Sequence, residues 1–301
     1  MRAPPGSEWR RLTVVVGGRT ARYGTAGTGA PVVFLHGWGI SDRAYEPALR
    51  RLATSGVRVV APALPGFGGT PALAAEHQSF TGYADWLADF TEAVGITEPA
   101  VVVGHSFGGG VAIMFAHRHQ ERTRGLVLVN SVGGSAWREH RSVLRSMADR
   151  PLWDWGLHLS RDLLPWRQLT RVLPVIVSEA VPNLVRDPRA FMRAAAVARS
   201  ADLATELEEL RDRGLPVVVL WGAKDRVVPE ASVDALCEAV GVTRTTLEGG
   251  HGWLIGQPDA FSEVMTNVLE LVDEGPRRER RTRWWRRGDP RRSDDASKAT
   301  G

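Results

Sequence analysis

The chain has 301 residues, of which 43% are hydrophobic and 24% are charged, and these proportions are typical of a soluble globular protein. That length accommodates one large domain with an insertion, or two ordinary domains. A single cysteine, Cys237, excludes an intrachain disulfide. The first residues lack the apolar core of a signal peptide, and no apolar run is long enough to span a bilayer. We therefore expect a cytoplasmic protein.

The net charge of +4 originates at the C-terminal end. Residues 275–301 contain nine arginines and one lysine against one glutamate and three aspartates, a net charge of +6, which leaves −2 for residues 1–274. Dense charge with few apolar residues predicts a disordered tail. A solvated terminus is the favoured interpretation of this tail. The Arg- and Trp-rich stretch 277–287 also allows weak peripheral contact with a membrane surface, and nucleic acid is the less favoured partner.

Apolar runs of strand length alternate with amphipathic helical stretches along most of the chain. Two short runs around Gly17 and Gly18 predict a β-hairpin. After the hairpin the strand-like runs are continuously apolar, as in a parallel sheet that helices cover on both faces. The expected strands are residues 31–37, 57–66, 100–106, 125–131, 216–222 and 244–250, and the expected helices are residues 43–54, 81–94, 108–119, 230–240 and 258–272.

One long interval, between Asn130 and Pro216, contains helix-forming sequence and no strand-like run. We interpret residues 134–214 as a helical cap inserted over one end of the sheet. Residues 1–133 and 215–274 then form the core domain that the cap interrupts. The tryptophan, leucine and methionine content of the cap favours a largely apolar pocket beneath it.

The segment from Gly104 to Gly108 has the pattern G-x-S-x-G, between an apolar strand and an expected helix. A serine that exposes its hydroxyl at the end of a strand must lie in a sharp, strained turn. Glycines two residues before and after it let the neighbouring backbones approach closely. The N–H group that follows the serine lies at a helix N-terminus, where negative charge is stabilised. This context predicts that Ser106 is placed for nucleophilic attack.

Four further motifs, together with this turn, resemble those of the α/β-hydrolase superfamily over about residues 10–272. They are "FLHGWG", "PALPGFGGT", "LWGAKDRVVP" and "EGGHGWLIGQPDAF". The resemblance implies an α/β-hydrolase fold, which is a mostly parallel, twisted sheet with helices on both faces and a helical cap insertion. One residue departs from the family pattern. Ala63 stands where the family usually has an aspartate that braces a loop.

The resemblance also implies a catalytic triad, because Ser106, Asp225 and His251 follow the family order of nucleophile, acid and histidine. Ser106 would attack the substrate, His251 would act as general base, and Asp225 would orient the imidazole. Some family members carry the catalytic acid one strand earlier, at the end of the strand before the one that leads to Asp225. Asn130 and Ser131 stand there in this chain and offer no carboxylate.

The oxyanion hole implied by the resemblance consists of the main-chain N–H groups of Trp38 and Phe107. These are main-chain donors, so the side chains remain free to line a pocket or to fill the core. No cofactor and no metal ion is expected. Around the substrate pocket the sequence places His36, Gly37, His105, Trp137 and Trp253.

The leading hypothesis is a serine hydrolase that cleaves carboxylic esters, with lipophilic esters favoured, through an acyl-enzyme. A nucleophilic serine excludes dehalogenation and epoxide opening, which need a carboxylate nucleophile on this fold. Hydrolysis of a C–C bond or an amide, and cofactor-free perhydrolysis, use the same triad and stay open. Gly252 follows His251 directly, whereas C–C hydrolases of this type have tryptophan there. A ligand-binding member of the fold without turnover is a further alternative, and the oligomeric state is not predicted.

Overall fold

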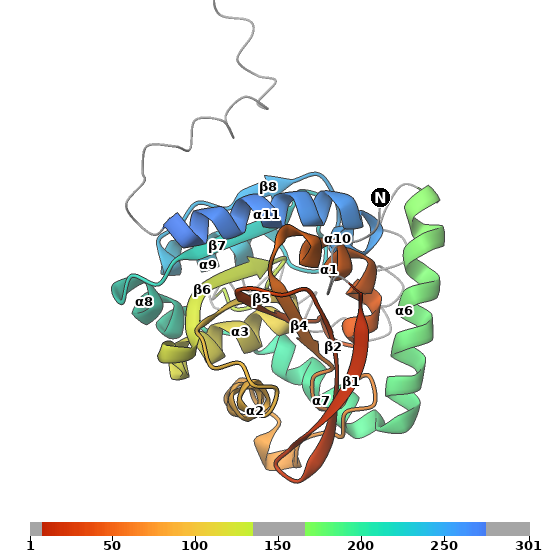
Figure 1. The fold of residues 1–301 in the computed structure, drawn as a ribbon. Helices are drawn as coiled ribbons and strands as arrows, with labels where there is room; N and C mark the ends of the chain where they lie inside the picture. The colour runs from red at the N-terminus through yellow and green to blue at the C-terminus, as the bar shows by residue number, and fades with distance from the viewer. Residues whose placement is uncertain (1–7, 135–165, 275–301) are drawn as a thin grey trace, which may run out of the picture.

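The computed structural model describes residues 8–134 and 166–274 (Figure 1). The predictions made for Trp137 and for the tail segment 277–287 concern residues outside these ranges. Within the described part of the chain, eight strands form one sheet in the order β1-β2-β4-β3-β5-β6-β7-β8. Their bounds are β1 Arg10–Val16, β2 Arg19–Ala26, β3 Pro31–Leu35, β4 Arg58–Pro62, β5 Ala100–His105, β6 Thr123–Val129, β7 Val217–Gly222 and β8 Thr245–Leu247.

The sheet is parallel from β4 to β8 and antiparallel at its N-terminal edge. Strands β1 and β2 form the predicted hairpin, whose turn contains Gly17 at φ 53° and Gly18 at φ 76°. Two successive positive φ values suit a tight hairpin turn, and glycine adopts them without steric cost. The predicted mostly parallel α/β sheet is therefore confirmed.

Alternate side chains of the central strands point to opposite faces, and each face is buried. Val33 and Leu35 of β3 contribute to one apolar cluster, whereas Val32 and Phe34 contribute to the other. The two-residue period of a strand produces this division, and it requires apolar residues at every position. This requirement explains why the strands read as continuous apolar runs.

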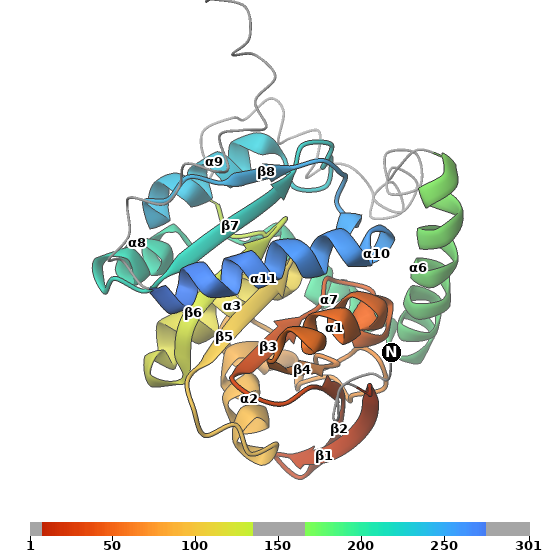
Figure 2. The ribbon, with the colours of Figure 1, turned by 45° about the horizontal axis from the view of Figure 1, so that its top comes forward.

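Helices cover both faces of the sheet (Figures 1 and 2). One layer contains α1 (Glu46–Leu52), α10 (Trp253–Gly256) and α11 (Pro258–Glu274). The other contains α2 (Phe80–Ala93), α3 (Phe107–Arg118), α8 (Ala204–Asp212) and α9 (Glu230–Val240). Short 3-10 turns lie at η1 (Asp42–Tyr45), η2 (Ala53–Ser55), η3 (Ala75–His77) and η4 (Gln120–Arg122). None of the described helices combines the length and the apolar character that crossing a bilayer requires.

Among the described residues between β6 and β7, three helices precede the return of the chain to the sheet. Figure 2 shows α6 (Trp166–Arg186) along the outer edge of the molecule, followed by α7 (Pro188–Arg199). Helix α8 packs against α3 and α9 in the helical layer. The division into a cap at 134–214 and a core on either side of it stays a prediction.

The order of the strands reverses direction between β3 and β5. These strands are neighbours, yet β3 leads to β4 on one side and β5 leads to β6 on the other. In open α/β sheets, ligands bind outside the carboxyl ends of the strands at such a reversal of direction. The loop after β3 and the turn at Ser106 both begin at this position.

Candidate active site

Ser106 lies in a strained turn between β5 and α3. Its positive φ of 53°, combined with a ψ of −118°, is a backbone conformation that residues with side chains rarely adopt, at a cost of about 1–3 kcal/mol. The surrounding sheet holds the turn in place. The Ser106 N–H donates to the Val129 carbonyl at 3.1 Å, and the Ser106 carbonyl accepts from the Gly109 N–H at 2.9 Å. The strand therefore ends abruptly at a hydroxyl-bearing residue.

The two glycines of the G-x-S-x-G pattern are required by close backbone contacts. A Cβ atom on Gly104 would lie 2.5 Å from the Gly108 carbonyl oxygen, and one on Gly108 would lie 2.4 Å from the Leu35 carbonyl oxygen. Both distances are shorter than van der Waals contact. Helix α3 can approach β3 and β5 this closely only because both positions lack a side chain.

Asp225 and His251 form a buried hydrogen-bonded pair. His251 Nδ1 lies 2.9 Å from Asp225 Oδ2, and the other carboxylate oxygen accepts N–H groups from Val227 at 2.8 Å and Val228 at 3.0 Å. These donors fix the orientation of the carboxylate. It accepts the Nδ1 proton of His251, so that Nε2 of the neutral imidazole is free to act as a base.

The loop that carries His251 lies against the turn that carries Ser106. The ring centroids of His105 and His251 are 4.8 Å apart, and His105 directly precedes Ser106. Ser106 and His251 are each 9% exposed, so both are largely shielded while retaining some access to solvent. The structure therefore brings together the strand end, the acid turn and the histidine loop that sequence analysis singled out.

The loop after β3 packs directly on the Ser106 turn. A Cβ atom on Gly37 would lie 3.4 Å from Ser106 Cβ and 3.0 Å from His105 Nδ1, and Gly39 has a φ of 85°. The Gly37 N–H donates to the Tyr45 hydroxyl at 3.1 Å. Among the described residues, the Trp38 N–H has no hydrogen-bond acceptor, and Phe107 begins α3, where N–H groups lack partners within the helix.

Two residues expected near the pocket are core residues in the structure. His36 is fully buried; its Nδ1 donates to the Gly37 carbonyl at 2.8 Å, and its Nε2 accepts the Leu64 N–H at 2.9 Å. Burial lowers the pKa of His36 to about 4, so the neutral ring holds both loops. Trp253 packs against Phe261 in the cluster beneath α11, with ring centroids 5.9 Å apart.

The segment 166–199 contacts the loop after β3 through side chains that the sequence motifs did not single out. Asn183 donates to the Gly39 carbonyl at 3.1 Å and accepts the Gly68 N–H at 3.0 Å. Trp38 Nε1 donates to the Phe191 carbonyl at 2.9 Å, and the two rings lie 4.5 Å apart. These contacts place the aromatic ring of Phe191 beside the loop.

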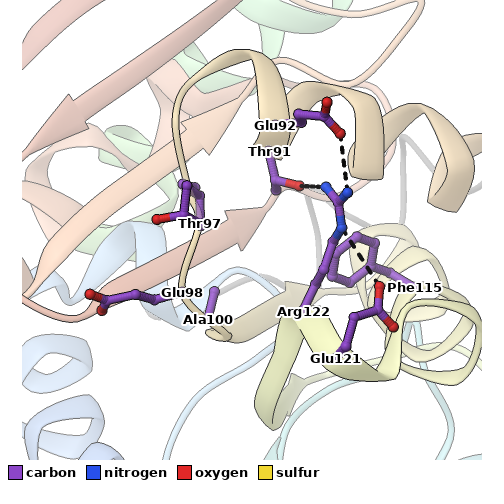
Figure 3. A pocket seen from close by; sticks show the side chains of 9 residues that line it. Thr91, Glu92, Thr97, Glu98, Ala100, Phe115, Glu121 and Arg122 are labelled. Atoms are coloured by element: carbon purple, nitrogen blue, oxygen red, sulfur yellow. Dashed lines mark hydrogen bonds and ion pairs between the residues drawn. The ribbon is translucent and has the colours of Figure 1, made fainter.

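A pocket lies at the opposite end of β5, around Arg122 (Figure 3). The Arg122 guanidinium binds Thr91 Oγ1, the Ala88 carbonyl, Glu92 and Glu121. These bonds connect η4 to α2, so the role of Arg122 is structural. In the part of the chain that the structure describes, no cluster of His, Cys, Asp or Glu is suited to holding a metal ion.

Comparison with known proteins identifies the class. The model of the family described as "Alpha/beta hydrolase family" matches residues 32–264, and the chain therefore belongs to this family. Within it, the chain is similar to proteins of several activities.

Three curated relatives illustrate this range. A protein of Mycobacterium phage D29, provisionally named a non-heme haloperoxidase, is 28% identical to this chain. The matched region covers 84% of this chain and 92% of the phage protein. The pimeloyl-[acyl-carrier protein] methyl ester esterase of Aeromonas hydrophila is 28% identical, covering 81% and 96%. The 2-hydroxy-6-oxo-2,4-heptadienoate hydrolase of Pseudomonas putida is 29% identical, covering 86% and 96%.

A solved structure has the same fold. The esterase from Thermogutta terrifontis superposes with a TM-score of 0.68 at 23% identity, covering 87% of this chain and 99% of that one.

Proposed function

We propose that the protein is a serine hydrolase of carboxylic esters. His251 Nε2 takes the Ser106 proton as Oγ attacks the ester carbonyl, and Asp225 stabilises the imidazolium that forms. The Trp38 and Phe107 N–H groups stabilise the oxyanion. His251 then protonates the departing alcohol and activates water to release the acid. The observation that carries the proposal is the hydrogen bond between His251 Nδ1 and Asp225, on a loop where the His251 ring lies 4.8 Å from that of His105, the residue before Ser106.

The surroundings favour an ester with an apolar portion. Phe191 lies 4.5 Å from Trp38 and 6.2 Å from Phe67 between ring centroids, and these rings stand next to the proposed oxyanion donor. Aromatic side chains beside a few polar groups are typical of sites for apolar small molecules. The similarity to the Aeromonas esterase supports the same bond type.

A second candidate is hydrolysis of a C–C bond, which the similarity to the Pseudomonas putida hydrolase favours. This reaction would use the same serine and histidine. The glycine after His251 argues against it, because C–C hydrolases of this type have tryptophan at this position. Assaying a vinylogous 1,5-diketone beside an ester separates the two candidates: an ester hydrolase should turn over the ester far faster.

The test is a series of p-nitrophenyl esters of increasing acyl length. We expect turnover with a preference for medium over acetyl chains, and a loss of kcat of more than about a thousandfold in Ser106→Ala. Ser131→Ala is the matched control, because its buried hydroxyl donates to the Val132 carbonyl at 2.7 Å and has no catalytic role in the proposal. Equal activity in Ser106→Ala and the unmodified protein would refute the proposal.

A further inference from the structure

We propose that Tyr45 and His105 are positioning residues that join the oxyanion loop to the loop carrying His251. The inference deepens the proposed function and rests on it, because the two loops matter only if they carry the oxyanion donor and the general base. It begins from a chain of three hydrogen bonds. Gly37 N lies 3.1 Å from Tyr45 Oη, Tyr45 Oη lies 2.8 Å from His105 Nδ1, and His105 Nε2 lies 2.9 Å from the His251 carbonyl oxygen.

The chemistry of the two ends fixes the direction of every bond in this chain. A carbonyl oxygen only accepts, so His105 Nε2 must carry the hydrogen that it shares with His251. In a neutral imidazole, Nδ1 is then an acceptor, and the Tyr45 hydroxyl must donate to it. The Tyr45 oxygen keeps its lone pairs for the Gly37 N–H. Donation therefore runs in one direction, from the oxyanion loop to the histidine loop.

Burial gives these bonds their importance. Tyr45 is fully buried and His105 is 2% exposed, so water cannot replace a lost partner, and an unsatisfied polar atom there is costly. His36, Tyr45 and His251 are the titratable groups that face His105. Burial first, and then the unfavourable electrostatic interaction of a protonated ring with the neighbouring His251 and His36, hold the pKa of His105 well below its ordinary value. The neutral ring that the bond directions require is therefore the stable form.

Asn130 strengthens the same junction from the other side. Its amide donates to the Gly250 and His251 carbonyls, each at 3.3 Å, and its oxygen accepts the Gly222 N–H at 3.1 Å. It shares with Ser106 the unusual positive φ, here 45°. The His251 carbonyl is thus bonded from the end of β5 and from the end of β6. The main chain at His251 is fixed relative to Ser106.

The first test compares two buried tyrosines that lose the same atom. Tyr45→Phe leaves His105 Nδ1 and the Gly37 N–H without their partner, so we expect kcat to fall about tenfold while KM changes less than about twofold. Tyr83→Phe is the control, because that hydroxyl donates to the Pro65 carbonyl at 3.3 Å. Equal effects of the two substitutions on kcat would overturn the proposal.

Substitutions at His105 separate positioning from packing. Glutamine can still present an N–H group to the His251 carbonyl, whereas phenylalanine cannot. We expect His105→Gln to retain several times more kcat than His105→Phe. Adding Tyr45→Phe to His105→Phe should cost little more, because the connection is already broken. Full additivity of the two losses would contradict a single connection.

The decisive measurement does not need turnover. In ¹⁵N-histidine spectra of the resting protein, His105, identified by the loss of its signals in His105→Gln, should show the Nε2–H tautomer and stay neutral from about pH 5.5 to about pH 8.5. An Nδ1–H tautomer or a titration in this range would overturn the inference. If the spectra agree but no ester is cleaved, the proposed function fails while the connection stands.

Discussion

Burial converts His36 from a titrating side chain into a neutral structural one. Its ring donates to Gly37 and accepts from Leu64, and the second bond needs the neutral form because a protonated Nε2 cannot accept. The pKa of His36 falls from 6.5 to about 4 in the folded protein. As the pH drops, the unfolded chain therefore binds a proton before the folded protein does. The stability that depends on this residue is present above about pH 6.5 and is lost as the pH falls towards 4.

We predict that His36→Gln weakens the acid sensitivity of the protein. The lowered pKa corresponds to about 3 kcal/mol of unfolding free energy lost between about pH 6.5 and pH 4. Glutamine does not titrate, so the variant should be less stable at neutral pH but lose less on acidification. Urea unfolding at several pH values measures this. His77→Gln, at an exposed histidine, should keep the wild-type slope; an unchanged slope in His36→Gln would contradict the assignment.

At the scale of elements, α6 helps to hold the loop after β3 in place. Asn183 bonds two separate loops with one amide, through Gly39 and Gly68, and is only 2% exposed. Trp38 adds a bond from that loop to Phe191 in α7. The loop that would supply an oxyanion donor is therefore held from two sides, by Tyr45 and by these helices.

We predict that Asn183→Ala lowers kcat/KM by about tenfold or more and destabilises the fold by about 1–3 kcal/mol, because it leaves buried polar atoms of both loops unpaired. Ser178→Ala on the same helix is the control, since that exposed hydroxyl donates to the Val175 carbonyl of its own helix. Ester hydrolysis and thermal unfolding measure the two effects. Wild-type kcat/KM in Asn183→Ala would show that α6 does not support the loop.

Sequence patterns located most elements because each pattern has a local cause. Continuous apolar runs marked the buried strands, and the glycines around Ser106 marked a turn whose backbone contacts exclude side chains. Tyr45 and Asn183 carried no such signal. Their importance depends on partners 60 and 144 residues away, His105 and Gly39. A hydroxyl or an amide in a helical stretch does not reveal which distant loop it will contact.

Two expectations show the same limit at single positions. Trp253 follows the histidine motif and could have lined a pocket, but the following helix turns it into the core. Asn130 offered no carboxylate and was set aside, yet it binds the main chain of the histidine loop. Residue type predicted what each side chain could donate or accept. Only the packing of the sheet and its helices determined which partner each side chain would bind.

At the scale of the whole molecule, the sheet order explains why the candidate residues meet. Ser106 follows β5, Asp225 follows β7 and His251 follows β8, and these strands run parallel in the order β5-β6-β7-β8. Their carboxyl ends therefore lie at one edge of the sheet. The loop after β3 joins them because β3 and β5 are neighbours. The proposed nucleophile, base and oxyanion site therefore converge there, although they are far apart in sequence.

The central claim is that the Ser106 oxygen is the nucleophile, and covalent labelling tests it most directly. Diethyl p-nitrophenyl phosphate transfers its phosphoryl group to an activated serine and leaves an adduct that is hydrolysed slowly. We predict release of about one equivalent of p-nitrophenol, a diethylphosphoryl group on the peptide that contains Ser106, and much slower labelling in His251→Ala. Labelling at another residue, or equal labelling of Ser106→Ala, would contradict the account.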